Sequence, residues 1–310
     1  MMREIVVGTR DSQLALWQAN WVVDRLRERN PGYSFRIQGI KTHGDNILDV
    51  ALAKIGDKGL FTKELEVALL SDEIDLAVHS MKDLPTDLPG GLAVGAVCER
   101  EYPGDVLVSS QGYVLDKLPE GAVIGTSSLR RTAQLLHYRQ DLRIVNIRGN
   151  LNTRLRKMDE EKLDGVVLAY AGIQRLGLKD RITERIPMEI CLPAVGQGSI
   201  GIEIRHLDEE IMDIVETIEH RPSRIAVSAE RNFLKRLEGG CQVPIGAYGL
   251  VIGNEIKFEG LIASLDGKHL VRDVIAGPVN EAAKIGVKLA ESLLKKGGRE
   301  ILRAVRQENC

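Results

Sequence analysis

A pattern that occurs twice restricts the fold of this 310-residue chain more than any other feature: a short apolar strand, a Gly-Thr turn rich in hydroxyl groups, and a helix. The first copy covers residues 4–29 and the second begins at residue 122. Each copy is followed by a later apolar strand that an aspartate introduces, Asp75 in one case and Asp164 in the other. Strands that alternate with helices indicate parallel sheets with helices on both faces. The sequence therefore predicts two similar α/β lobes.

The first lobe carries polar side chains at positions that suit anions. Thr9, Arg10 and Ser12 precede a predicted helix, where free N–H groups and the helix dipole favour negative charge. Ser12 alone is typical of a helix N-cap, whereas a cation such as Arg10 is unfavourable there unless it meets an anion. A buried strand over 74–79 delivers Ser80-Met81-Lys82-Asp83 to the sheet edge at which open α/β sheets bind ligands. We expect a ligand site there, beneath a mobile cover formed by the irregular connection 41–61.

The second lobe contains a run of arginines. Between residues 126 and 157 there are eight basic residues, seven of them arginine, and a single acid, Asp141. A solvated face normally mixes charges and uses lysine, whereas arginine favours paired hydrogen bonds to carboxylate or phosphate. Aromatic residues make up only 4% of the chain, and Tyr138 alone lies in this run, so nucleic acid is a poor fit. The run indicates recognition of small polycarboxylates.

The last third of the chain presents a cysteine on a loop. A predicted helix over 222–237 leads into Leu-Glu-Gly-Gly-Cys-Gln-Val-Pro at 237–244, where two glycines allow a bulky group to approach the thiol of Cys241. A lone cysteine is more often a packed structural residue, but the second glycine favours a ligand-holding loop. Three antiparallel strands and a helix over 279–296, ended by Gly297 and Gly298, complete a small α+β domain.

The predicted fold class is α/β, with two similar doubly wound lobes and a small α+β third domain that contains a three-stranded antiparallel sheet. The length favours two or three domains. The expected boundaries are 1–99 with 199–217 for the first lobe, 104–193 for the second lobe and 221–310 for the third domain.

Composition indicates a soluble globular protein, with 44% hydrophobic and 28% charged residues and no apolar run long enough to span a bilayer. The N-terminus runs directly into a strand without a signal-peptide pattern, so we expect a cytoplasmic protein. The four cysteines show no disulfide or CxxC pattern and are expected to be reduced. The six histidines form no cluster, so no metal is expected.

Seven motifs, in order along nearly the whole chain, resemble the porphobilinogen deaminase (hydroxymethylbilane synthase) family. They are Gly-Thr-Arg-x-Ser-x-Leu-Ala-Leu-Trp-Gln-Ala at 8–19, Lys-Gly-Leu-Phe-x-Lys-Glu-Leu-Glu at 58–66, Ala-Val-His-Ser-Met-Lys-Asp at 77–83, Gly-Thr-Ser-Ser-Leu-Arg-Arg at 125–131, Arg-Gly-Asn at 148–150, Leu-Pro-Ala-Val-Gly-Gln-Gly at 192–198 and Leu-Glu-Gly-Gly-Cys-Gln-Val-Pro-Ile-Gly at 237–246. Single motifs of this kind are weak, but seven in sequence are specific.

The resemblance implies periplasmic-binding-protein-like lobes and a transferase that joins four porphobilinogen molecules, with loss of ammonia, onto a dipyrromethane cofactor and then releases hydroxymethylbilane, in porphyrin and heme biosynthesis. It implies that the cofactor is attached to Cys241 by a thioether and that Asp83 is catalytic. It also implies further contacts: to the cofactor from Lys82, Thr126, Ser127, Ser128, Arg130, Arg131 and Arg154; to the substrate from Arg10, Ser12, Arg148, Arg175 and Gln197; and in the lid from Lys58 and Phe61. The expected partner is the small-molecule substrate, with no nucleic acid and no membrane, and the protein is expected to be a monomer.

Two departures from the family pattern stand out. Asp11 and Gln13 replace the glutamine and proline often found in the first motif, and residues 99–105 lack the common Asp-Pro-Arg-Asp at the link between the lobes. The second departure puts any hinge contact of the missing arginine in doubt.

Two other classes of function compete with the enzyme. A two-lobed anion-binding protein without catalysis would bind its ligand reversibly and carry no covalent adduct. A cysteine hydrolase would need a histidine base beside Cys241, and no sequence feature pairs His79, His220 or His269 with that thiol.

Overall fold

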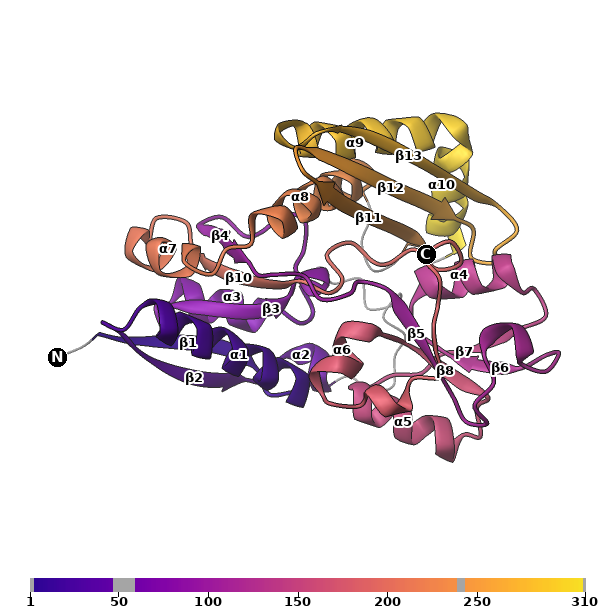
Figure 1. Cartoon of the computed structure of the whole chain (residues 1–310), viewed down its shortest axis with the longest axis horizontal. Helices are drawn as coiled ribbons and strands as arrows, with labels where there is room; N and C mark the ends of the chain where they lie inside the picture. The colour runs from indigo at the N-terminus through magenta and orange to yellow at the C-terminus, as the bar shows by residue number, and fades with distance from the viewer. Residues whose placement is uncertain (1–2, 47–58, 239–242, 309–310) are drawn as a thin grey trace. The chain divides into compact units, whose positions relative to one another are not determined.

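The computed structural model describes residues 3–46, 59–238 and 243–308 (Figure 1). Contacts divide these residues into two compact units. The first contains residues 3–46, 59–101 and 198–224, and the second contains residues 102–197, 225–238 and 243–308. The second lobe and the third domain expected from the sequence thus fall within one unit.

The first unit is a doubly wound lobe. Its sheet has the order β2-β1-β3-β10-β4, in which β1, β2 and β3 are parallel and β10 is antiparallel to both of its neighbours. The strands are β1 (Glu4–Arg10), β2 (Ser34–Ile40), β3 (Leu76–Ser80), β4 (Leu92–Val97) and β10 (Ile200–Arg205). The helices are α1 (Gln13–Arg29), α2 (His43–Asn46), the 3-10 turn η2 (Met81–Asp83), α3 (Lys63–Leu70) and α7 (Glu209–Glu216).

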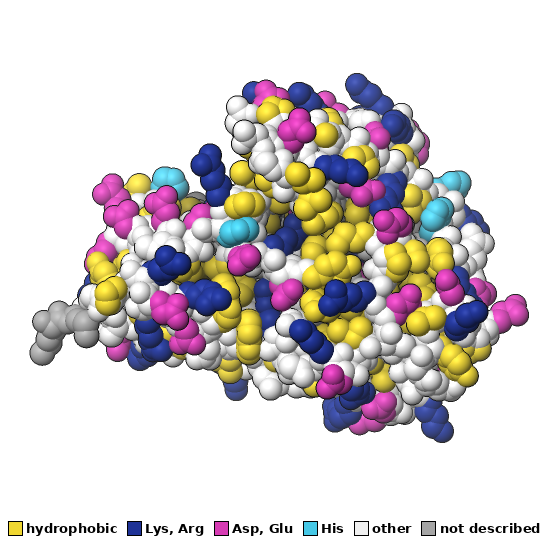
Figure 2. All heavy atoms as spheres, viewed as in Figure 1, with side chains coloured by type: hydrophobic (Ala, Val, Ile, Leu, Met, Phe, Trp, Pro, Cys, Tyr) yellow, Lys and Arg dark blue, Asp and Glu magenta, His cyan; other side chains and the backbone are white. Residues whose placement is uncertain are grey.

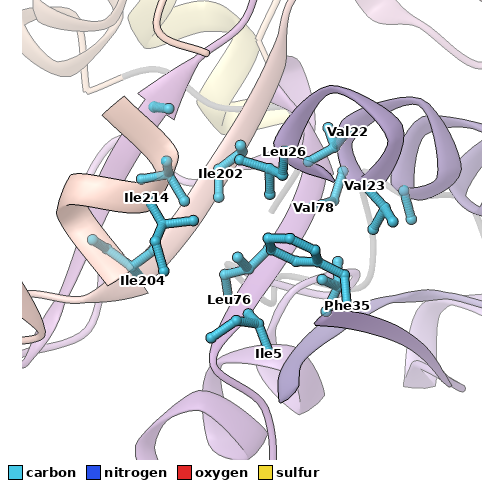
Figure 3. Packing of buried hydrophobic residues seen from close by; sticks show 14 of the residues in the cluster. Ile5, Val22, Val23, Leu26, Phe35, Leu76, Val78, Ile202, Ile204 and Ile214 are labelled. Atoms are coloured by element: carbon cyan, nitrogen blue, oxygen red, sulfur yellow. The ribbon is translucent and has the colours of Figure 1, made fainter. Parts of the chain in front are cut away.

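The core of this lobe explains why helices cover both faces. On one face, side chains of α1 and α7 such as Leu26 and Ile214 pack against Ile5, Leu76 and Ile202 (Figure 3). On the other face, α3 packs against the opposite side of the same strands. Apolar residues on both sides of each central strand are typical of a sheet buried between two helical layers.

The sheet of the second lobe repeats this arrangement, with the order β7-β6-β8-β5-β9. Its strands are β5 (Asp105–Ser109), β6 (Val123–Gly125), β7 (Arg143–Val145), β8 (Gly165–Ala169) and β9 (Glu184–Arg185), and its helices are η3 (Leu115–Lys117), α4 (Leu129–Tyr138), α5 (Leu151–Glu160), α6 (Tyr170–Arg175) and η4 (Lys179–Arg181). Three parallel strands stand beside one antiparallel strand, as in the first lobe. The predicted fold class is confirmed.

The two aspartates noted in the sequence have equivalent structural roles. The carboxylate of Asp75 accepts a hydrogen bond from the backbone N–H of Val6 at 2.7 Å, and the carboxylate of Asp164 accepts one from Val123, also at 2.7 Å. In each lobe the aspartate thus ties the start of one parallel strand to its neighbour in the sheet, β3 to β1 and β8 to β6. The repeat seen in the sequence is therefore a structural repeat.

The third domain packs the sheet β11-β12-β13 against helices α8, α9 and α10 (Figure 1). Its elements are α8 (Arg221–Arg236), β11 (Ile245–Ile252), β12 (Glu255–Ala263), β13 (Leu270–Pro278), η5 (Val279–Glu281), α9 (Ala282–Leu293), the π-helical turn η6 (Leu294–Gly298) and α10 (Arg299–Glu308). A Cβ on Gly286 of α9 would lie 2.1 Å from the backbone oxygen of Ala229, so this glycine lets α8 and α9 pack closely. In the core of the domain, Phe233 of α8 and Phe258 of β12 pack edge-to-face, with 5.5 Å between their ring centroids.

One expectation for this domain was wrong. The sequence predicts that the chain's last helix ends at Gly297 and Gly298, but α10 follows directly. Gly297, within η6, has φ of +106° and interrupts the helical run, after which an amphipathic segment resumes and buries Leu302 and Val305. The glycine pair marks a bend between two helices.

Within the second unit, the third domain is attached to the second lobe by direct contacts. The imidazole Nδ1 of His137 lies 2.7 Å from the backbone oxygen of Gly267, and Arg272 donates to the backbone oxygen of Glu189 at 2.6 Å. Ala133 and Leu261 belong to one small apolar cluster across this contact.

Candidate active site

The segment that carries Asp83 is held at the C-terminal end of β3 by buried neighbours. Met81 is 1% exposed and its backbone N–H donates to the backbone oxygen of Ser199 at 2.9 Å, while Leu84 on the other side is also buried. The side chain of Gln18 donates to Ser80 Oγ at 2.9 Å. Lys82 and Asp83 lie between these anchors and are only partly buried. The fold thus fixes the Asp83 backbone and leaves the residue partly exposed.

Two other candidate residues of the first unit lie together. The guanidinium of Arg10 lies over the ring of Phe61, 4.3 Å from its centroid, so a residue assigned to the substrate meets one assigned to the lid. Ser12 is the N-cap of α1 and accepts a hydrogen bond from the backbone N–H of Ala15 at 3.3 Å. Lys58, the other lid residue, lies outside the described residues.

Thr62 is the residue before α3, but its side chain makes no hydrogen bond that caps the helix. Its hydroxyl instead donates to the carboxylate of Glu66 at 2.7 Å. Burial raises the pKa of Glu66, and the hydrogen bond from Thr62 opposes that rise. His79 Nε2 and Glu203 Oε2 meet nearby at 3.0 Å, both almost fully buried. The sequence did not predict the pairing of His79 with Glu203, because the two residues lie on separate strands, β3 and β10.

In the second unit, the Gly-Thr turn supplies hydroxyl groups that the fold already uses. The Ser128 hydroxyl is the N-cap of α4 and accepts from the backbone N–H of Arg131, while Ser127 donates to the backbone oxygen of Ile147. Thr126 is buried, and its hydroxyl accepts from the backbone N–H of Ser128 at 3.2 Å. All three help to shape the turn, so any contact with a ligand is additional to a structural role.

Arg130 and Arg131 are buried and paired with one carboxylate. Arg130 Nη1 lies 2.8 Å from Asp105 Oδ2, and Arg131 Nη2 lies 2.7 Å from Asp105 Oδ1. Burial works to raise the pKa of Asp105, but the two guanidinium charges outweigh it and hold the pKa of that carboxyl well below its usual range. Gln197, expected as a ligand contact, is 1% exposed and donates to Asp105 Oδ1 at 2.9 Å. These residues form a single buried network.

The Nη1 of Arg148 is buried and has no hydrogen-bond partner among the described residues. The residue is 9% exposed. Arg154, one turn into α5, is partly buried and donates through Nε to the backbone oxygen of Gly149 at 2.9 Å. Arg175 lies at the end of α6 and is partly buried. A buried guanidinium nitrogen without a partner is costly unless an acceptor reaches it.

The remaining basic residues of the 126–157 run differ in their surroundings. Arg139 donates to the backbone oxygens of Leu115 and Leu118, both at 3.0 Å, and so stabilises a loop. Arg143 and Arg156 are exposed, and Lys157 is partly buried. On the face shown in Figure 2, acidic and basic side chains are interspersed. Three of the eight basic residues of the run, Arg130, Arg131 and Arg148, are buried.

Cys241 lies outside the described residues, but both flanks of its loop are anchored. Leu237 is 2% exposed at the end of α8, and its backbone oxygen accepts from Arg306 Nη2 of α10 at 3.0 Å. Glu238 adopts φ of +51°, which ends the helix, and Val243 on the far side is buried. The helix that the sequence prediction missed thus holds one end of the loop.

No group of three or more His, Cys, Asp or Glu side chains that could hold a metal ion occurs in the described residues. Among the helices of the same residues, none combines the length and the apolar character needed to cross a bilayer.

The fold and these side chains define a class: a two-lobed α/β protein with a small third domain, in which one lobe holds buried arginines. Comparison with known proteins is more specific. The family model described as "Porphobilinogen deaminase, dipyromethane cofactor binding domain" matches residues 5–213, and that described as "Porphobilinogen deaminase, C-terminal domain" matches residues 224–295.

Full-length relatives agree with these matches. The chain is 65% identical over 308 residues to a porphobilinogen deaminase of Pelotomaculum thermopropionicum, 58% identical over 308 residues to one of Carboxydothermus hydrogenoformans and 61% identical over 306 residues to one of Desulforudis audaxviator. Each comparison covers 99% of this chain and 99% of the relative. The chain belongs to the porphobilinogen deaminase family.

Proposed function

We propose that this protein is a transferase that condenses four porphobilinogen molecules head to tail, with loss of ammonia, and releases hydroxymethylbilane by hydrolysis. The observation that carries the proposal is the buried surplus of positive charge in the second lobe. Each pyrrole of the substrate brings an acetate and a propionate, so the growing product accumulates carboxylates. A carboxylate that leaves water loses its hydration, and a buried arginine compensates for that loss through ion pairing and paired hydrogen bonds.

The residues present fit a dipyrromethane cofactor. The buried Nη1 of Arg148 and the buried Nε atoms of Arg130 and Arg131 have no hydrogen-bond partner in the described part of the chain, so acceptors are missing where a carboxylate-bearing group is expected. In this proposal Cys241 holds the cofactor through a thioether, and its carboxylates are bound by Lys82, Thr126, Ser127, Ser128, Arg130, Arg131 and Arg154. When bound, the dipyrromethane supplies the pyrrole carbon to which the first porphobilinogen is joined.

Asp83 is the catalytic residue of the proposal. Each condensation breaks a carbon–nitrogen bond as ammonia leaves, and it ends with the loss of one ring proton. A carboxylate beside pyrrole nitrogens stabilises the positive charge that develops between these events and assists the proton transfers. The anchored backbone on either side of Asp83 suits this role, because a fixed carboxylate does not have to reorganise in the transition state.

The incoming substrate meets Arg10, Ser12, Arg148, Arg175 and Gln197 in this scheme, and Lys58 and Phe61 cover it. The contact between Arg10 and Phe61 supports the link between substrate binding and the lid. The substrate is the only partner proposed, and we propose that the protein works as a cytoplasmic monomer.

Replacement of Asp83 by Asn tests the proposal. The variant removes the charge and keeps the shape, so it should retain the covalent cofactor and lose roughly 100-fold or more of kcat. Porphobilinogen consumption and intact mass are measured together, with Asp24→Asn on the exposed side of α1 as a matched control. Wild-type turnover in Asp83→Asn would remove Asp83 from the mechanism. A wild-type protein that binds porphobilinogen but consumes none would favour the anion-binding alternative.

A further inference from the structure

Asp105 is a fully buried carboxylate whose four acceptor positions are filled by four different side chains. Arg131 Nη2 and Gln197 Nε2 reach Oδ1 at 2.7 and 2.9 Å. Arg130 Nη1 reaches Oδ2 at 2.8 Å, and the thiol of Cys191 donates to the same oxygen at 3.4 Å. Two carboxylate oxygens offer about four lone-pair sites, so this carboxylate is saturated.

Both arginines are also tied to the surrounding backbone. Arg130 Nη1 also donates to the backbone oxygen of Leu192 at 2.8 Å, and Arg131 Nη1 donates to that of Val167 at 2.9 Å. Leu192 is in turn fixed by Gln134, whose Oε1 accepts from its backbone N–H at 2.7 Å. The position of each guanidinium is therefore set by one carboxylate and one carbonyl group.

The charges of this network do not balance. Arg130 and Arg131 contribute two positive charges and Asp105 contributes one negative charge. Burial, with a further contribution from Asp105, raises the pKa of the Cys191 thiol to about 12, so Cys191 stays neutral near pH 7. One buried positive charge remains, and such a charge is unfavourable until an anion compensates it.

We propose that Asp105 is a positioning residue, which neutralises one of the two guanidinium charges and holds both arginines so that the remaining charge meets a carboxylate of the covalent pyrrole chain. Gln197 acts with it as a second support of the carboxylate. The inference rests on the proposed function, because that function assigns Arg130 and Arg131 to the cofactor carboxylates. Asp105 itself touches no substrate.

The test compares Asp105→Asn with Asp141→Asn. Both substitutions remove a carboxylate that pairs with an arginine of the second unit, but Asp141 pairs with Arg139, which lies outside the proposed site. The readouts are the fraction of chains that carry the adduct, from intact mass, and kcat and KM per adduct-bearing chain. We expect Asp105→Asn to lose at least tenfold in adduct fraction or in kcat, with KM changed less than threefold, and Asp141→Asn to stay within twofold of wild type.

A second pair of variants keeps the test decisive if Asp105→Asn does not fold. Arg130→Gln alone removes the surplus charge but leaves Asp105 to hold Arg131. Arg130→Gln with Asp105→Asn restores the native net charge of the network and releases Arg131. We expect the double variant to lose at least tenfold more in kcat than Arg130→Gln, at equal thermal stability within a few degrees.

The outcomes separate the two proposals. Wild-type adduct fraction and kinetics in Asp105→Asn, or equal kcat in Arg130→Gln and the double variant, would overturn the positioning role and leave the enzyme assignment intact. If the wild-type chain itself carries no adduct and consumes no porphobilinogen, the proposed function fails first.

Discussion

Arg148 should destabilise the cofactor-free protein and contribute to activity only when the ligand is bound. Its Nη1 is buried without a partner in the described residues, and an unsatisfied buried donor costs about 1–3 kcal/mol. Arg148→Met keeps the length and apolar stem of the side chain and removes that donor. The substitution should therefore raise the free energy of unfolding of the cofactor-free protein by a similar amount.

The matching assay uses two backgrounds. In a Cys241→Ser background, where no cofactor can be attached, Arg148→Met should raise Tm by roughly 2–4 °C for each kcal/mol gained. In the wild-type background, loss of a buried charge partner should cost about 2–5 kcal/mol of transition-state stabilisation, so kcat/KM should fall roughly 30- to 4,000-fold. Arg156→Met is the control, because the Arg156 side chain on the following helix α5 is 67% exposed and its replacement should change neither quantity.

A lower Tm for Arg148→Met in the cofactor-free background, with Arg156→Met unchanged, would refute this reasoning. It would mean that the Arg148 guanidinium has partners within the protein and is not waiting for an anion.

Two further predictions concern the scaffold. Gly198→Ala should lower the free energy of unfolding by about 1–3 kcal/mol in urea titrations, because Gly198 has φ of +93° and a Cβ there would lie 2.4 Å from the backbone oxygen of Glu101. The control is Gly90→Ala, which should change the free energy of unfolding little because the space around its Cβ is open. Equal effects of the two substitutions would contradict this argument. Glu66→Gln should remove a pH dependence of stability. Burial raises the pKa of Glu66 above its ordinary value of 4.5, so the wild-type protein loses stability as the pH rises from that value through the folded-state pKa. The free energy of unfolding, measured across this range, should therefore fall less steeply with pH in the variant than in the wild type. Parallel curves for the two proteins would show that Glu66 does not titrate with folding.

Much of the fold follows from local sequence. Strands and helices alternate with clear apolar patterns, and the paired Gly-Thr turns and strand-leading aspartates predict two lobes of one design. The last helix was missed because Gly297 and Gly298 are strong helix-end signals, and only the burial of Leu302 and Val305 shows that a new helix follows. Local turn chemistry cannot report that tertiary packing.

The candidate site was less accessible to sequence reasoning. The excess of arginine between residues 126 and 157 indicated an anion site, but Asp105, the carboxylate that pairs with Arg130 and Arg131, lies 25 residues before Arg130. Antiparallel pairing with β8 brings β5, the strand that begins at Asp105, next to the parallel strands of the lobe. An aspartate at the start of an otherwise apolar Val-Leu-Val strand was the signal available, and it is weak without the fold. Arg139, which the same run included, proved to bind backbone carbonyl groups instead.

The intact mass of the purified protein tests the central claim most directly. We expect the mass of the bare chain plus that of two linked pyrrole units in the wild-type protein, and the bare mass in Cys241→Ser. A wild-type protein at the bare mass that nevertheless produces hydroxymethylbilane from porphobilinogen, or an adduct that persists in Cys241→Ser, would contradict a primer fixed at Cys241.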